Sequence, residues 1–133
     1  MAYLENISDK DLKKGIKQFM QTAPEIYMPG VSVDSVVFGF NNDKLKVLLL
    51  RFGSTNNYVL PGGYIKKEED LDDAALRILQ ERTGLENIYL DQFYTSGNTG
   101  RSQKNVAREL VEKIVGKIPN NNWFEQRFIS VCY

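Results

Sequence analysis

Acidic side chains gather near the middle of the chain, where their type and spacing could bind a cation. Residues 68–82 contain six acids and two arginines: Glu68, Glu69, Asp70, Asp72, Asp73 and Glu81, with Arg77 and Arg82. Carboxylate oxygens favour hard divalent ions such as Mg²⁺ or Ca²⁺. Acids that precede or open a helix can also simply be solvated residues that complement the helix dipole. Both readings remain open from these residues alone.

Other kinds of catalytic site are excluded by composition. The sequence has no histidine and one cysteine, Cys132. A nucleophile activated by histidine therefore cannot be assembled within this chain. A Cys/His zinc site and an intrachain disulfide are excluded for the same reason.

The spacing of residues 63–85 resembles the Nudix box, G-x5-E-x7-R-E-U-x-E-E-x-G-U, in which U is apolar. The matching positions are Gly63, Glu69, Arg77, Leu79, Glu81, Gly84 and Leu85. Residues 58–63 also resemble the segment that leads into this box. The resemblance implies a Nudix-like α/β/α sandwich with a mixed β-sheet, an added N-terminal helix and an inserted helix. It also implies a structural pair between Glu69 and Arg77.

Two box positions depart from the family pattern, because Ile78 and Arg82 stand where glutamates are expected. Positions 78, 81 and 82 share one helical face, which in active family members carries the metal-binding carboxylates. We therefore expect impaired catalysis, no catalytic residues, and no cofactor or metal. The alternative is a divergent hydrolase of a nucleoside diphosphate derivative such as ADP-ribose, which would use Mg²⁺ held by Glu69 and Glu81.

A narrower resemblance involves residues 94–98 and 127–131, which look like Nudix-related transcriptional regulators. That resemblance implies a small-molecule effector domain, a homodimer, and DNA binding through a winged-helix domain downstream of this chain. The N-terminal helix and the inserted helix resemble the sugar-responsive branch, so a sugar such as L-arabinose is the expected effector. A purely structural dimerisation module is a further possibility.

Candidate ligand-binding residues follow from their expected positions in the Nudix cleft. They are Arg51, Tyr58, Gly62, Gly63, Arg77, Glu81 and Tyr94. A neutral sugar would need planar hydrogen-bonding groups and an aromatic or apolar wall, but no metal. Tyr58 and Tyr94 also suit a core position, and Arg51 a strand end.

Hydrophobic periodicity predicts the elements that must position these residues. Helices are expected at residues 8–22, 68–83 and 103–116. Strands are expected at 31–40, 44–51, 58–60, 88–95 and 123–133. The first two strands form a predicted hairpin, whose second, very apolar arm should be central in a sheet.

The overall composition predicts one globular domain. The chain has 133 residues, 17 basic and 17 acidic, so its formal net charge is zero. We expect a helical extension at residues 1–30 and a Nudix-like domain at 31–133, incomplete at its C-terminus. The balanced charge argues against nucleic-acid binding by this chain alone. No apolar run is long enough for a membrane span, and a cytoplasmic location is expected.

Overall fold

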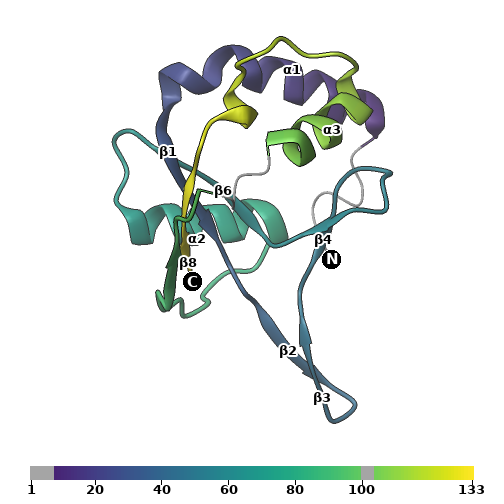
Figure 1. Cartoon of the computed structure of the whole chain (residues 1–133). Helices are drawn as coiled ribbons and strands as arrows, with labels where there is room; N and C mark the ends of the chain where they lie inside the picture. The colour runs from purple at the N-terminus through teal and green to yellow at the C-terminus, as the bar shows by residue number, and fades with distance from the viewer. Residues whose placement is uncertain (1–7, 100–103) are drawn as a thin grey trace.

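The computed structural model describes residues 8–99 and 104–133 (Figure 1). Its elements are α1 (Asp9–Ile26), β1 (Tyr27–Asp34), β2 (Phe38–Asn41), β3 (Lys44–Val47), β4 (Leu50–Arg51), β5 (Tyr58–Val59), β6 (Gly62–Lys66), α2 (Leu71–Thr83), β7 (Tyr94–Ser96), α3 (Lys104–Val115), a 3-10 helix η2 (Trp123–Glu125) and β8 (Ile129–Cys132). No helix of the described residues is both long and apolar enough to cross a bilayer.

A four-stranded sheet forms the centre of the fold, in the order β6-β1-β8-β7. β1 and β8 are parallel, whereas β6 and β7 run antiparallel to their neighbours. The sheet is therefore mixed, as the sequence predicted. Strand alternation sends successive side chains to opposite faces, so each face needs its own cover.

Helices provide that cover on both faces (Figure 1). Ile65 of β6 packs against α2, in a core with Val33, Ala74, Ala75, Ile78, Val131 and Tyr133. The adjacent Tyr64 points the other way, into a cluster with Ala23 of α1, Trp123 and Phe128. α3 extends this second layer, where Val111, Val115 and Ile118 pack with residues of α1. The arrangement confirms the predicted α/β/α sandwich.

All three predicted helices are present, with shifted ends. Ser8 caps α1, because its hydroxyl accepts a hydrogen bond from the Asp11 amide. α1 nevertheless runs past Pro24, which the sequence placed after its end; Ala23, fully buried beside Trp123, anchors this last turn. α2 starts at Leu71 and not at residue 68, because Glu69 turns back to accept from the Lys66 amide. Residue 103, where the third helix was predicted to begin, lies outside the described residues.

The strand predictions were less accurate. The predicted strand 31–40 is divided at residues 35–37, where the Ser35 amide donates to the Pro61 carbonyl. The predicted strands 88–95 and 123–133 shorten to β7 and β8, with η2 before β8. β6 was missed, because the two glycines at its start read as a break.

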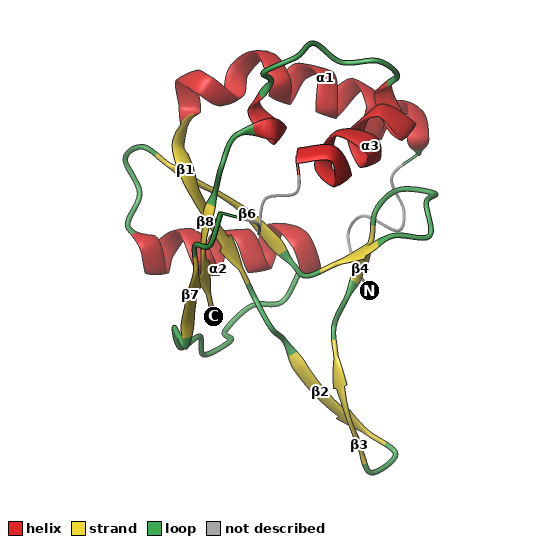
Figure 2. Ribbon diagram, in the orientation of Figure 1, coloured by secondary structure: helices red, strands yellow, loops and turns green. Residues whose placement is uncertain are grey.

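The predicted β2–β3 hairpin is present, but its predicted central position is wrong. It forms its own two-stranded sheet and projects from the body of the domain (Figure 2). Asn42 and Asp43 connect the strands with positive φ angles of 51° and 57°, as a tight hairpin turn requires. All eight strand residues are exposed. The apolar sequence of this segment therefore does not reflect burial within the described chain.

Candidate functional site

An ion pair joins the turn before α2 to the middle of that helix. Arg77 Nε lies 2.6 Å from Glu69 Oε1, and Arg77 Nη2 lies 2.8 Å from Glu69 Oε2. Nη2 also donates to the Tyr64 carbonyl at 3.0 Å, which links the pair to β6. Hydrogen bonding from Arg77 holds the pKa of Glu69 below its ordinary value, with the Lys66 amide contributing less. These contacts fasten the box segment to the sheet.

Glu81 belongs to the same network. Its carboxylate accepts from Arg77 Nη1 at 3.0 Å, and its side chain is 54% exposed. All three guanidinium nitrogens of Arg77 are therefore engaged by protein acceptors. Arg77 and Glu81 have been predicted as ligand-binding residues, but their present contacts are with each other, Glu69 and the backbone.

Residues 78, 81 and 82 were expected to present their side chains on one helical face, but in the structure these side chains make contacts in different directions. Ile78 is 1% exposed and packs against Gly63, where an added Cβ would lie 3.1 Å from the isoleucine carbons. Arg82 instead donates from Nε to the Gly62 carbonyl at 3.0 Å. Ile78 and Arg82 both contact β6, whereas the Glu81 carboxylate accepts from Arg77, one helical turn earlier.

A cavity of about 380 Å³ lies beside Arg82 and Gly62. One wall of the cavity is formed by α1. The remaining walls come from α3, the β4–β5 segment, β6, α2 and η2. The α1 wall consists of Asp11, Leu12, Gly15, Ile16 and Phe19; the other lining residues are Leu50, Phe52, Gly53, Val59, Leu60, Gly62, Tyr64, Arg82, Val111 and Phe124. Asp11 and Gly15 are exposed, so the cavity opens to solvent at α1.

The polar groups of this cavity are few and of different kinds. Arg82 supplies a guanidinium and Asp11 a carboxylate, among largely apolar and aromatic neighbours. Burial raises the pKa of Tyr64 to about 12, although the positive charge of Arg82 opposes part of that increase. Tyr64 is therefore a neutral hydroxyl at ordinary pH, and Arg82 is the cationic group among the lining residues. A mainly apolar cavity with a few polar groups is typical of a small-molecule site.

The seven predicted ligand residues do not converge on this cavity. Gly62 lines it, and Gly63 packs behind it on Ile78. Arg51 is exposed, and Tyr58 is 61% exposed on β5. Tyr94 lies on β7, at the opposite edge of the sheet from β6, and is 60% exposed. The expectation that Tyr58 and Tyr94 are partly core residues is wrong, because both are exposed.

Sequence reasoning missed most of the residues that line the cavity. The apolar stripe of Leu12, Ile16 and Phe19 predicted the first helix, but not what that helix covers. Arg82 was the available signal, because it places a cation where the family pattern has an acid. Its role as a cavity residue depends on where α1 lies, which the motif does not specify.

The predicted oxygen donors for a divalent ion do not converge either. Within residues 8–99 and 104–133, no group of three or more Asp, Glu, Cys or His side chains is arranged to hold a metal. Glu69 and Glu81 both face the Arg77 guanidinium. This donor set does not fit a hard divalent cation, which prefers several oxygen ligands free of a competing positive charge.

Part of the chain is similar in sequence to a transcriptional repressor. The ADPR responsive transcriptional repressor NtrR of Acinetobacter baylyi is 32% identical over 81 residues, covering 57% of this chain and 32% of that protein. The chain thus spans about a third of the length of this relative.

Solved structures and the family match extend the comparison. The NUDIX domain of Shewanella oneidensis NrtR, complexed with ADP-ribose, has a TM-score of 0.53 and 26% identity, covering 88% of this chain and 67% of that chain. A MutT/nudix family protein from Enterococcus faecalis has a TM-score of 0.51 and 26% identity, covering 92% of this chain and 42% of that one. Residues 28–129 match the NUDIX domain family. Since that match extends over most of the chain and agrees with the fold, the chain belongs to the Nudix family.

Proposed function

We propose that this chain is the effector-binding domain of a transcriptional regulator, and that it binds ADP-ribose or a close analogue without turning it over efficiently. The observation that carries the proposal is Arg82, a cation in a largely apolar cavity at a box position where the family pattern has a carboxylate. A guanidinium suits the diphosphate of such a ligand, because Arg–phosphate hydrogen bonds are charge-assisted.

The relatives support a nucleotide ligand over a sugar. The Acinetobacter repressor is named for its response to ADPR, and the Shewanella domain was solved with ADP-ribose. The L-arabinose expectation gains no support from either relative. A neutral pentose also offers no charge to match Arg82. The aromatic residues Phe19, Phe52 and Phe124 could provide flat surfaces for a base.

Binding without a metal is part of the proposal. The acids that a divergent hydrolase would use, Glu69 and Glu81, are paired with Arg77. Arg82 would therefore supply positive charge that a metal ion supplies in an enzyme of this family. DNA binding, through another domain, and dimer formation belong to the regulator as a whole and are inferred from the resemblance.

Isothermal titration tests the proposal. ADP-ribose and L-arabinose are titrated separately into the chain, each with Mg²⁺ and with EDTA. We expect ADP-ribose to bind equally under both conditions. Arg82→Gln should weaken it by about 10- to 150-fold, from the 1.5–3 kcal/mol of a charged hydrogen bond. Arg51→Gln is the matched control, since Arg51 is exposed and does not line the cavity.

Each alternative predicts a different result. Mg²⁺-dependent binding with release of AMP or phosphate would establish the divergent hydrolase instead. Binding of L-arabinose alone, unaffected by Arg82→Gln, would establish the sugar-responsive reading. No heat from either compound would favour a purely structural domain.

A further inference from the structure

α1 carries four lysines on one side. They are Lys10, Lys13, Lys14 and Lys17, which follow the i, i+3, i+4, i+7 spacing of a single helical face. Because a helix turns by about 100° per residue, the four positions fall within an arc of about 100° around the helix axis. All four residues are exposed. We call them the lysine face of α1.

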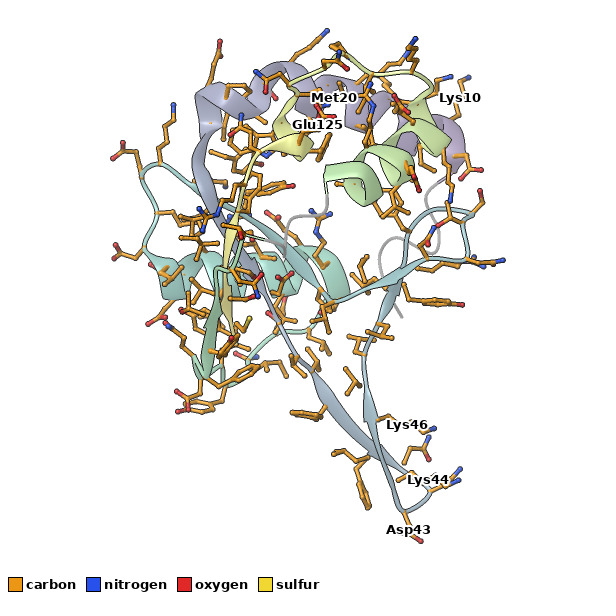
Figure 3. All side chains as sticks on the ribbon, in the orientation of Figure 1. Lys10, Met20, Asp43, Lys44, Lys46 and Glu125 are labelled. Carbon is orange, nitrogen blue, oxygen red and sulfur yellow. The ribbon has the colours of Figure 1, made fainter. Side chains whose placement is uncertain are left out.

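The lysine face lies away from the buried side of the helix. The apolar stripe of Leu12, Ile16 and Phe19 is centred roughly 140° away around the helix axis. That stripe lines the cavity, and Ile16 and Phe19 also pack in the α3 and aromatic clusters. α1 runs along the outer side of the molecule (Figure 1), and Lys10 lies at the outer surface (Figure 3). The lysine face is therefore accessible to another molecule.

The described acids do not neutralise the lysine face. Within residues 8–99 and 104–133, every salt bridge involves Arg77 or Arg108, and none involves a lysine of α1. The acids in the first turn of the helix, Asp9 and Asp11, are centred about 90–110° away around its axis. Positive charges so close together repel one another, so an anion with several charges stabilises them. The zero net charge of the chain, which argued against nucleic-acid binding, therefore conceals a local excess.

We propose that the lysine face contacts the phosphate backbone of duplex DNA. The choice of DNA rests on the proposed function, because the effector domain of a transcriptional regulator is held close to DNA. The four lysines span about 10 Å along the helix axis, which equals the length of about three base pairs. Lysine suits this role, since its ammonium group on a flexible stem meets a phosphate as a point charge.

This contact differs from the one that the family resemblance implies for a winged-helix domain. Phosphate contacts fix orientation and add affinity, but they carry no sequence information directly. A winged-helix domain would read the bases, whereas α1 would add a second contact, made by the effector domain itself. The DNA affinity of the regulator would then depend partly on residues outside the domain that reads the sequence.

Two other polyanionic partners fit the lysine face less well. A helix that binds an anionic membrane inserts an apolar face into the lipid, but the apolar stripe of α1 already packs within the domain. An acidic protein would have to place its carboxylates at the spacing of the lysines. Duplex DNA instead carries one charge per about 1.7 Å of its axis, so it offers phosphates in any register.

Fluorescence anisotropy of a labelled duplex of about 20 base pairs and arbitrary sequence tests this inference. The chain is added up to about 1 mM without ADP-ribose, at KCl concentrations between about 50 and 200 mM. We expect a dissociation constant on the order of 100 µM at the lowest salt concentration. Four phosphate contacts predict a log–log salt slope of about −3.6, so the affinity should fall about 150-fold across this range.

Paired variants locate the contact on the molecule. Lys13→Gln with Lys17→Gln should weaken DNA binding at least tenfold and reduce the magnitude of the salt slope by about 1.8. Lys44→Gln with Lys46→Gln removes the same charge from exposed positions of the β2–β3 hairpin, and should leave binding within about twofold. Lys13→Arg with Lys17→Arg keeps the charge and should retain binding. Thermal unfolding of all three double variants checks that the fold is intact.

Three results would overturn the inference. The first is an absence of DNA binding at the lowest salt concentration, and the second is equal weakening by the two glutamine pairs. The third is tighter binding to phosphatidylserine vesicles or to polyglutamate than to the duplex. ADP-ribose binding is titrated separately, so a chain that binds ADP-ribose but not DNA would lose this inference and keep the proposed function.

Discussion

Gly15→Leu should separate loss of the ligand site from loss of the fold. Gly15 faces the cavity from the middle of α1, and a Cβ added there would meet no atom within 4 Å. Glycine in a helix interior costs about 1 kcal/mol relative to alanine, and leucine is nearly as favourable as alanine. The variant should therefore unfold with a free energy equal to or up to about 1 kcal/mol above that of the unmodified chain.

Ligand affinity should change in the opposite direction. A leucine-sized side chain occupies on the order of 100 Å³, about a quarter of the 380 Å³ cavity. Forcing extra atoms into an occupied site costs about 1–3 kcal/mol. That penalty corresponds to about a 5- to 150-fold increase in the dissociation constant for ADP-ribose. A misfolded protein would instead lose stability and affinity together.

Two measurements on three proteins suffice for this test. Urea unfolding gives the stability, and titration calorimetry gives the dissociation constant, for the unmodified chain, Gly15→Leu and Gly15→Ala. Gly15→Ala gains the higher helix propensity of alanine but adds only one methyl group to the cavity. Its affinity for ADP-ribose should therefore stay within about twofold of that of the unmodified chain. If Gly15→Leu is stable and binds ADP-ribose as tightly as the unmodified chain, then the cavity beneath α1 is not the ligand site.

Two further predictions concern the segment that supports the site. Because Arg77 holds the pKa of Glu69 below its ordinary value, the ion pair contributes fully above the unfolded value of about 4.3 and is lost as pH falls through the folded pKa. Urea unfolding should therefore show Glu69→Gln to be about 1–3 kcal/mol less stable than the unmodified chain at pH 7. This difference in unfolding free energy should narrow below pH 4. A difference that does not change with pH would contradict the prediction. Gly62→Ala should cost about 1–3 kcal/mol, because its Cβ would lie 2.9 Å from the Val33 carbonyl. Gly97→Ala, with its nearest atom at 3.6 Å, should change stability by less than about 0.5 kcal/mol.

The helices and the family were predictable because their signals are local. The stripe of Leu12, Ile16 and Phe19 repeats at helical spacing, and the Nudix spacing is carried by residues within one short segment. β6 was missed because Gly62 and Gly63 were interpreted as residues that end a strand and begin a loop. In the structure they are strand residues without room for side chains: Gly63 packs against Ile78, and Gly62 against the Val33 carbonyl.

The site was less predictable because it depends on contacts between distant segments. Gly53 illustrates this: it has a φ of 57°, and a Cβ there would lie 3.0 Å from Leu12 of α1 and 3.1 Å from Ile114 of α3. No periodicity shows that these three segments meet. α1 also lies outside residues 28–129, the part that matches the family. A prediction by position in the family cleft therefore did not include the α1 residues that line the cavity.

The two lost glutamates of the box are not equivalent, and restoring them one at a time should show this. Ile78 is 1% exposed against Gly63, so Ile78→Glu would bury a carboxylate in the apolar core beneath β6. We expect it to destabilise the chain by more than about 3 kcal/mol. Arg82→Glu replaces a half-buried side chain beside the cavity and should fold with a loss of about 1–2 kcal/mol, from its hydrogen bond to Gly62.

Neither variant should gain tight Mg²⁺ binding, because the Glu81 carboxylate remains paired with Arg77. Urea unfolding and Mg²⁺ titration of each single variant check both statements. An Ile78→Glu protein as stable as the unmodified chain would show that position 78 can still present a carboxylate to solvent. The expected result means that packing has replaced the metal ligand at position 78, whereas at position 82 the charge alone has changed. Core packing, and not merely surface charge, would then exclude a metal ligand at position 78.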